Sequence, residues 1–447
     1  MTRRLRSILL FVLWGLPAIS LAEGLLDVFN LAIENDPQLR AAMANRDAIK
    51  EAKAQAFADF LPSVNSTASV TQYYQVYDLY LVYFENGAPP VEASYGLNMF
   101  KSYQGYLTLR QPVFDMELLA RNKTANLEVT RSVLGYRIAQ QELIYRVIER
   151  YFEVLQKTGD LNFARAEKKA VARQLRTTKA RFDAGLIAVT DVHEAQARHD
   201  LSVALEIMSE SELALAEEKM REVTGQSPKQ LFPLREETPL VPPTPTNIND
   251  WVNAARLQNL RIAEQQLKAD VANQRINEIK ARYFPKFDIT ANGGYVDYGG
   301  AYSQVYKDAN VSLNMNMELY KGGRTRSEIR QARKQHESES HTLDQIEREV
   351  LTETRSAYLG VLAGMSYVKA INQATQSSGK ALAATEAGFD VGTRTAVQVM
   401  DAQRELFRNQ RDYAHARYQY ILNTLKLKKA VGLLTIDDIE QINSWLQ

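Results

Sequence analysis

Cysteine is absent from the 447 residues of this chain, and histidine occurs only five times. The lack of cysteine excludes disulfide bonds, zinc–thiolate sites, a cysteine nucleophile and a lipid carried on an N-terminal cysteine. The histidines lack the spacing of a zinc-protease helix, in which two histidines four residues apart flank a glutamate. We therefore expect no metal site, no cofactor and no enzymatic activity.

The chain also lacks any large excess of one charge, since 54 basic residues face 53 acidic ones. This balance gives no reason to expect a nucleic-acid partner. Beyond the N-terminal segment there is no run of about 18 uncharged apolar residues, so we expect no transmembrane helix. A role in a membrane would have to come from β-strands, the other structure that satisfies its backbone in lipid.

The N-terminal segment has the features of a secretory signal peptide. Three arginines fall within the first six residues, a short apolar run covers residues 8–16, and residues 20–22 form a small-residue cleavage site. We expect the mature chain to begin at Glu23. The alternative is an N-terminal helix buried in the fold.

Proline is confined to parts of the chain. None occurs from residue 113 to 227 or from 286 to the end, whereas residues 228–245 contain six. Both proline-free regions are rich in residues that favour helices. The pattern predicts two long helical regions joined by a proline-rich linker.

The two halves of the chain resemble each other. The sequence RFDAG at residues 181–185 matches GFDVG at residues 388–392, and the same offset pairs Tyr151 with Tyr358. A constant offset over such a distance indicates an internal duplication. The predicted parts are a signal peptide (1–22), a first repeat (23–227), a linker (228–248), a second repeat (249–432) and a C-terminal segment (433–447).

Each repeat follows one predicted order of elements. A first helix covers residues 24–60, and its copy residues 249–284, each ended by a proline. Two strands follow, and then a helix of some 65 residues, roughly 100 Å long. The chain reverses at Gly185, and again at Gly392, and a shorter helix returns and ends near Gly225 or Gly432, since glycine suits a helix C-terminus.

The strands are recognised by alternation. Val311, Leu313 and Met315 and the two apolar residues that follow at 317 and 319 alternate with polar residues, which is the period of a strand with one apolar face. Similar alternation covers residues 64–71, 107–113 and 287–292. Four strands cannot close a membrane barrel alone, because the smallest has about eight. The chain either closes a barrel by oligomerising or is a soluble periplasmic coiled-coil scaffold or adaptor.

Four local sequences resemble the TolC family of trimeric outer-membrane efflux and secretion channels. They are QPVFD at residues 111–115, LYKGG at 319–323, and the two helix reversals at 182–192 and 389–395. The resemblance implies a mostly α-helical chain whose four strands join those of two other copies in a twelve-stranded barrel in the outer membrane. It further implies a coiled-coil tunnel through the periplasm and, as partners, a periplasmic adaptor and an inner-membrane pump or ABC transporter.

In this family, polar bonds at the helix reversals hold the tunnel shut. The matching positions are Thr190 and Asp191 on the first hairpin and Arg394 on the second, and an arginine–carboxylate bond between hairpins would be directional and charge-assisted. The alternative is an ordinary solvated pair at helix ends. Phe389 stands where the family often has a tyrosine, so one such bond is expected to be missing.

The family also places acidic rings at the constriction of the tunnel. The two matching positions here are Gln398 and Asp401. With only one of them acidic, the resemblance implies a ring of half the charge, and therefore weakened cation selectivity.

Overall fold

The structure is a computed structural model that describes residues 23–77, 96–228, 230–235, 239–299 and 304–446. The expected signal peptide lies outside these residues. The described residues form two compact units, one drawn from residues 23–42, 137–259 and 348–446 and the other from residues 43–136 and 260–347. Each unit takes segments from both halves of the sequence, so the compact units cut across the two repeats.

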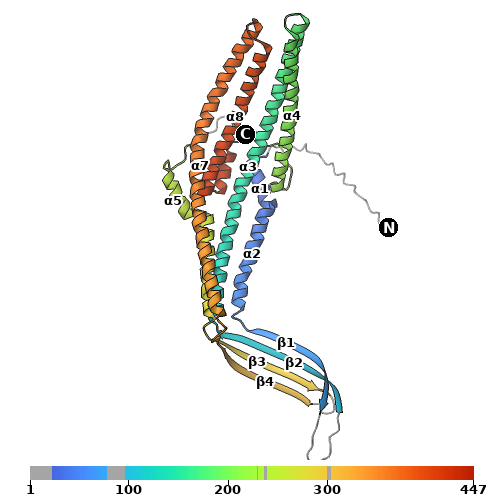
Figure 1. The fold of residues 1–447 in the computed structure, drawn as a ribbon, viewed down its shortest axis with the longest axis vertical. Coiled ribbons are helices and arrows are strands. Elements are labelled where there is room, and N and C mark those ends of the chain that lie inside the picture. The colour runs from blue at the N-terminus through green and yellow to red at the C-terminus, as the bar shows by residue number, and fades with distance from the viewer. Residues whose placement is uncertain (1–22, 78–95, 229, 236–238, 300–303, 447) are drawn as a thin grey trace, which may run out of the picture. The chain divides into compact units, whose positions relative to one another are not determined.

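The two halves contain the same elements in the same order (Figure 1). The first half has α1 Leu25–Asn35, α2 Pro37–Ala58, β1 Ser63–Tyr77, β2 Gly96–Phe114, α3 Met116–Asp183 and α4 Val189–Thr224. The second has α5 Ile248–Gln258, α6 Leu260–Ala281, β3 Lys286–Tyr298, β4 Gln304–Asn316, α7 Arg324–Asp390 and α8 Ala396–Val431, followed by α9 Ile436–Asn443. The lengths agree closely, with 68 residues in α3 and 67 in α7. The long helices, the strands and the duplication are as predicted.

The first helix of each repeat, expected to be continuous, is broken into two. Asp36 has an extended backbone (φ −63°, ψ 117°), because a residue before proline is disfavoured in the helical region. Its carboxylate then accepts the backbone N–H of Leu39 at 2.8 Å and caps α2. In the second repeat Asn259 is extended (φ −66°, ψ 125°), and its side-chain amide donates to the carbonyl of Ala430 at 2.8 Å.

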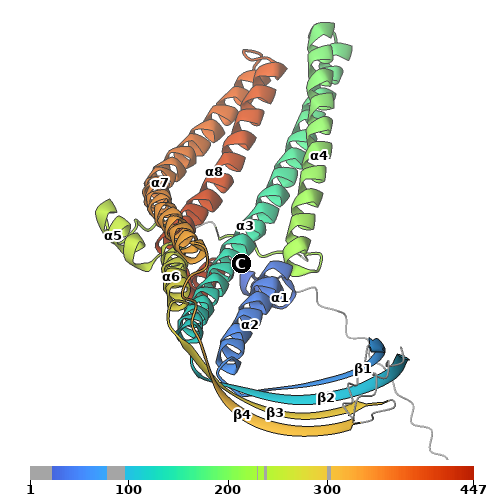
Figure 2. The same cartoon turned by 60° about the horizontal axis from the view of Figure 1, so that its bottom comes forward.

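The strands form one antiparallel sheet in the order β1-β2-β3-β4, which Figure 2 shows as a curved layer. Lys286 at the start of β3 pairs with Asn316 at the end of β4. Met317 and Leu319, predicted to continue this strand, lie beyond it because the ladder has no further partner there. The chain then turns through Gly322 and Gly323, both with positive φ, into α7.

The two faces of the sheet differ in polarity, as the alternation predicts. Residues paired across strands lie on one face. Val64, Leu109, Ala291 and Val311 are paired in succession across the four strands and make an apolar row. On the opposite face Asp288 bonds Arg110 at 3.0 Å. The sheet therefore has one face suited to lipid and one suited to water.

Tyrosine hydroxyls fix the proline-rich linker to the long helices. Tyr151 of α3 donates to the carbonyl of Phe232 at 2.9 Å, and burial raises its pKa, so it stays a protonated donor. Tyr420 of α8 donates to the carbonyl of Val241 at 2.7 Å. Tyr358, which the duplication pairs with Tyr151, also donates to a linker carbonyl. The duplicated tyrosines thus hold the linker from both repeats.

Among the described residues, no helix is both long and apolar enough to cross a membrane.

Gly432 ends α8 in a conformation that only glycine adopts without strain. Its φ is +84°, and a Cβ there would lie 2.5 Å from the carbonyl oxygen of Gln258. Gly392 has nearly the same φ, +81°, but open space around it. Both positions therefore share the left-handed cost of about 1–2 kcal/mol, and only Gly432 adds a clash.

We predict that Gly432→Ala lowers the apparent Tm of the detergent-solubilised protein more than Gly392→Ala does. The expected additional loss of stability is about 1–3 kcal/mol, the usual cost of overpacking. The measurement is thermal unfolding followed by circular dichroism, with both variants scanned at one rate. Equal losses of Tm in the two variants would show that the approach to Gln258 does not constrain this site.

Candidate functional site

Both helix reversals are closed by left-handed glycines. Gly185 has a φ of +71° and Gly392 a φ of +81°. The first turn is closed by the N–H of Leu186, which donates to the carbonyl of Arg181 at 2.9 Å, and the second by an equivalent 2.8 Å bond to the carbonyl of Gly388. α4 then returns alongside α3, and α8 alongside α7 (Figure 1). We call α3 with α4 the first hairpin, and α7 with α8 the second.

The three polar gate residues predicted from the sequence lie next to these turns. Thr190 and Asp191 occupy the first turn of α4 and are exposed and half-buried, respectively. Arg394 precedes α8, is exposed, and lies against Gly388, since a Cβ added to that glycine would lie 2.7 Å from the arginine Cγ. Among the described residues of one chain, no ion pair joins Arg394 to Asp191, so the fold of a single chain does not bring them together.

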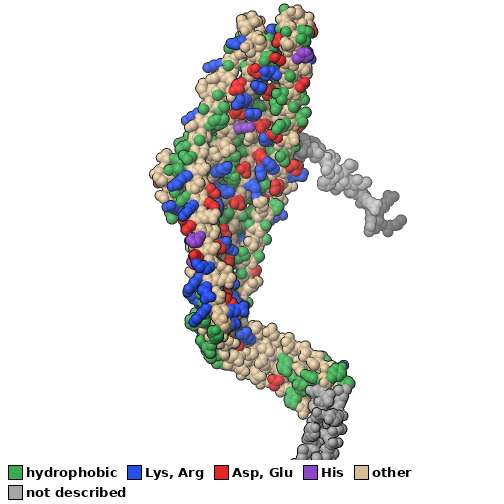
Figure 3. Space-filling view, viewed as in Figure 1, with side chains coloured by type: hydrophobic (Ala, Val, Ile, Leu, Met, Phe, Trp, Pro, Cys, Tyr) green, Lys and Arg blue, Asp and Glu red, His purple; other side chains and the backbone are tan. Residues whose placement is uncertain are grey.

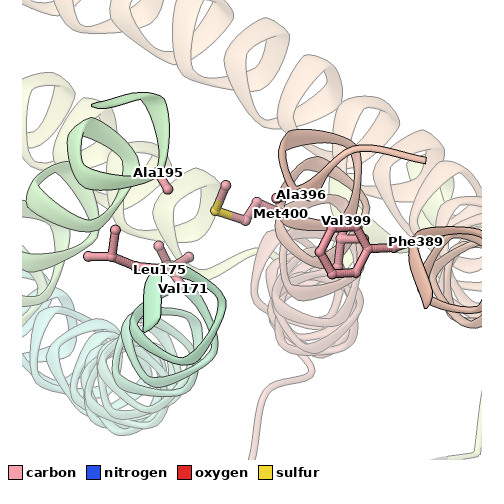
Figure 4. Packing of buried hydrophobic residues seen from close by; sticks show 7 residues of the cluster. All are labelled: Val171, Leu175, Ala195, Phe389, Ala396, Val399 and Met400. Carbon is pink, nitrogen blue, oxygen red and sulfur yellow. The ribbon is translucent and has the colours of Figure 1, made fainter. Parts of the chain in front are cut away.

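Phe389 is buried between the two hairpins rather than exposed at their tips. It belongs to a cluster of buried apolar side chains to which all four helices contribute. The members are Val171 and Leu175 of α3, Ala195 of α4, Phe389 of α7, and Ala396, Val399 and Met400 of α8. Figure 4 shows Met400 extending from the second hairpin toward Ala195 and Leu175 of the first. The cluster joins the hairpins of one chain.

The Phe389 ring is covered by Arg181, a contact that the sequence alone does not predict. The guanidinium carbon of Arg181 lies 3.9 Å from the ring centroid, and its Nη1 is 3.5 Å from the Phe389 carbonyl oxygen. A cation over an aromatic face contributes about 0.5–2 kcal/mol. The ring therefore links the first hairpin to the second without a hydroxyl. The two residues occupy nearly equivalent places in the repeats, but the repeat pattern does not show that they meet.

The two predicted ring positions both have side chains engaged within the chain. The Asp401 carboxylate lies 2.7 Å from Nη1 of Arg198, on α4 of the first hairpin, and 3.7 Å from Arg404. Gln398 is the third residue of a capping box, accepting the N–H of Thr395 at 3.0 Å. Arg198 was not predicted, because it lies on the other repeat and no local motif marks it.

The arrangement provides contacts between helices. Among the described residues, no group of three or more histidine, aspartate or glutamate side chains is placed to hold a metal ion. Among the described side chains near the tips, the contacts between hairpins include the apolar cluster, the cation–π contact and hydrogen bond of Arg181, and the Arg198–Asp401 ion pair. Such contacts resist the separation of two packed helical pairs.

Comparison with known proteins places the chain in a family. The family model described as outer membrane efflux protein matches residues 28–226 and 251–433, once in each repeat. The outer membrane protein TolC of Vibrio cholerae is 35% identical over 441 residues, covering 95% of this chain and 94% of that protein. The alkaline protease secretion protein AprF of Pseudomonas aeruginosa is 27% identical over 433 residues, covering 94% of this chain and 87% of that protein.

A solved structure agrees with the fold. The Campylobacter jejuni CmeC outer membrane channel superposes with a TM-score of 0.77 at 14% identity, covering 95% of this chain and 90% of that one. The family model, the relatives and this fold agree with the four sheet-forming strands and the long paired helices. The chain belongs to the outer membrane efflux protein family, and is an outer-membrane protein whose helices extend into the periplasm.

Proposed function

We propose that three copies of this chain form one export duct. Their strands close a twelve-stranded barrel, four from each chain, and their helices continue it as a periplasmic tunnel. The duct passes drugs and proteins delivered by an inner-membrane pump through a periplasmic adaptor, and catalyses no reaction. Within each chain the mature sequence starts at Glu23, and the linker (228–248) and C-terminal segment (433–447) surround the two repeats.

The barrel proposal rests on one observation: the sheet is open at both edges and has an exposed apolar face. Within the described residues the sheet ends in β1 on one side and β4 on the other. Val311 and Leu313 of β4 are 75% and 68% exposed. Unpaired strand edges are not tolerated in lipid, so other copies must cover them. Two copies would give eight strands, whose interior side chains fill the barrel, whereas three leave an open lumen.

The opposite face of the sheet suits a wet lumen. Asp288 is bonded by Arg110 at 3.0 Å and by Asn314 at 3.3 Å, and Asn314 also donates to Thr290 at 2.8 Å. A polar lining accepts chemically varied cargo without binding it tightly. The P. aeruginosa relative is named for the secretion of a protease and the family for efflux, which supports both classes of cargo for this chain.

The helix reversals offer a place for the adaptor or pump. Leu186 and Val391 are 72% and 75% exposed at the two turns. Exposed apolar side chains at corresponding turns support a protein contact there. A soluble scaffold would also expose its tips, but it would have no use for an exposed apolar sheet face.

We assign the closure of the tunnel to two kinds of contact. Arg394 of one chain bonds Thr190 and Asp191 of the next, which explains why one chain alone leaves these side chains apart. Within a chain, the Arg181–Phe389 contact and the Arg198–Asp401 pair (2.7 Å) hold the two hairpins together. Because Arg198 partly balances Asp401, the constriction ring formed with Gln398 selects cations only weakly.

The barrel proposal predicts opposite results for neighbouring residues of β4. Leu313→Asp puts a charge on the lipid face and should abolish both assembly in the outer membrane and resistance to exported drugs, because such a charge is destabilising in lipid. Ser312→Asp, on the polar face, should keep both. The measurement is drug susceptibility of a strain whose only copy is the variant, together with its outer-membrane content. Equal activity of the two variants would show that the apolar row does not face lipid.

The gate proposal predicts that Arg394→Ala raises the conductance of the purified protein in planar bilayers several-fold, with no pump present. Arg198→Ala should raise it less, because the apolar cluster still joins the hairpins. Lys369→Ala, which removes an exposed charge from α7, is the control and should conduct as the wild type does. Wild-type conductance in Arg394→Ala would mean that this residue is not part of the closure.

A further inference from the structure

Three arginines at the start of α7 form an unpaired basic face. Arg326, Arg330 and Arg333 are spaced i, i+4 and i+7, so they share one side of the helix, and all three are exposed. The packing side of α7 lies elsewhere, since Thr325 and Ala332 are buried. Within the described part of the chain, none of the three arginines has an ion-pair partner.

Nearby anions are already paired with other cations. Glu328 is bound by Arg324 at 3.0 Å and by Arg282 at 2.8 Å. Glu117 is bound by Lys286 at 2.6 Å and Arg282 at 3.3 Å. Burial alone would raise the pKa of Glu117, but these ion pairs outweigh it and the pKa is lowered. The carboxylates of Glu117 and Glu328 are therefore both occupied, which leaves the three arginines for an anion from outside the chain.

An apolar and aromatic rim lies next to the basic face, where the strands meet the helices. Leu319 and Tyr320, just before α7, are 83% and 86% exposed, and Tyr283, Phe284 and Phe114 are also exposed. Figure 3 shows hydrophobic side chains at this junction and Lys and Arg side chains gathered on the adjoining helices. Exposed aromatics beside membrane strands mark the boundary between hydrocarbon and water.

The geometry places the arginines at the depth of lipid headgroups. They lie in the first three turns of α7, within about 15 Å of its start. Arginine side chains extend toward the interface along their apolar stems, and their field reaches about 8–10 Å at physiological salt. A planar guanidinium binds phosphate through two parallel hydrogen bonds. Because the helices extend into the periplasm, the leaflet at this junction is the periplasmic one.

We propose that Arg326, Arg330 and Arg333 bind the phosphate headgroups of anionic phospholipids in the periplasmic leaflet of the outer membrane. The binding fixes the depth at which the barrel sits and attaches the start of α7 to the membrane. The inference rests on the trimeric barrel proposed above, because only an inserted barrel brings α7 to the leaflet.

The test is native mass spectrometry of the protein purified from outer membranes and released from mixed micelles of phosphatidylglycerol and phosphatidylethanolamine. The variant is Arg326→Gln with Arg330→Gln and Arg333→Gln. The matched control is Lys169→Gln with Arg173→Gln and Arg176→Gln, which removes three exposed charges at the same i, i+4, i+7 spacing from α3, far along the chain from the strands. Each spectrum gives both the number of chains and the lipids retained.

We expect wild type and control to retain phosphatidylglycerol in preference to phosphatidylethanolamine. In the α7 variant the ratio of retained phosphatidylglycerol to phosphatidylethanolamine should fall at least about fivefold, which is the factor that one basic residue near an anionic surface contributes. Trimers of all three proteins with the same preference would overturn the proposal and leave the barrel intact. Loss of the trimer in the α7 variant alone, with lipid preference unchanged, would assign the face to a neighbouring chain instead. Single chains of wild type would contradict the barrel itself.

Discussion

A strand edge in lipid leaves backbone N–H and C=O groups without partners, and each such group costs several kcal/mol. The sheet of this chain has two such edges, at β1 and β4. One face of the sheet is suited to lipid because of the apolar row through Val64, Leu109, Ala291 and Val311. When this face contacts lipid, the strand edges lie in lipid as well, where water cannot satisfy their backbone groups. The oligomerisation proposed above satisfies this constraint, and it would give a lumen lined by the polar face.

The same constraint gives the ends of the long helices different roles. Near the sheet, ion pairs around Glu117 and Glu328 fix the helices where they leave the strands. At the reversals the joining contacts between described residues are fewer: the apolar cluster, the cation–π contact and hydrogen bond of Arg181, and the pair of Arg198 with Asp401. Exposed ion pairs contribute only about 0–1 kcal/mol each. A tip held by few contacts can separate at low cost, which suits a closure that a docking partner opens.

The sequence was sufficient to predict features that depend on periodicity and repetition. The four strands, the helices of about equal length in both repeats and the glycine turns at Gly185 and Gly392 follow from alternation, proline placement and the constant offset. The break at Asp36 also has a local cause, the proline that follows it, which the prediction of one continuous helix over residues 24–60 does not take into account. The break at Asn259 has no such signal, because its side chain bonds Ala430 in another part of the sequence.

The contacts of the candidate gate were predictable only in part. Phe389 is marked by its place in a recognisable motif and Asp401 by its match to a ring position of the family, whereas Arg198 and Arg181 are marked only by the tertiary structure that brings the hairpins together. The spacing of the arginines in the sequence predicts the basic face of α7. Only the structure shows that these arginines are unpaired, because it shows that the nearby carboxylates are bound by other cations.

Edge-to-edge closure can be tested directly by cross-linking, because the natural chain has no cysteine. A cysteine at Asn65 in β1 is combined in turn with one at Asn310, Ser312 or Asn314 in β4, all on the polar face, and the outer membranes are oxidised and run on a denaturing gel. A ring of three chains predicts dimers and trimers in at least one combination and nothing larger. A ladder that continues past three chains, or no cross-linked product in any combination, would contradict the closed twelve-stranded barrel.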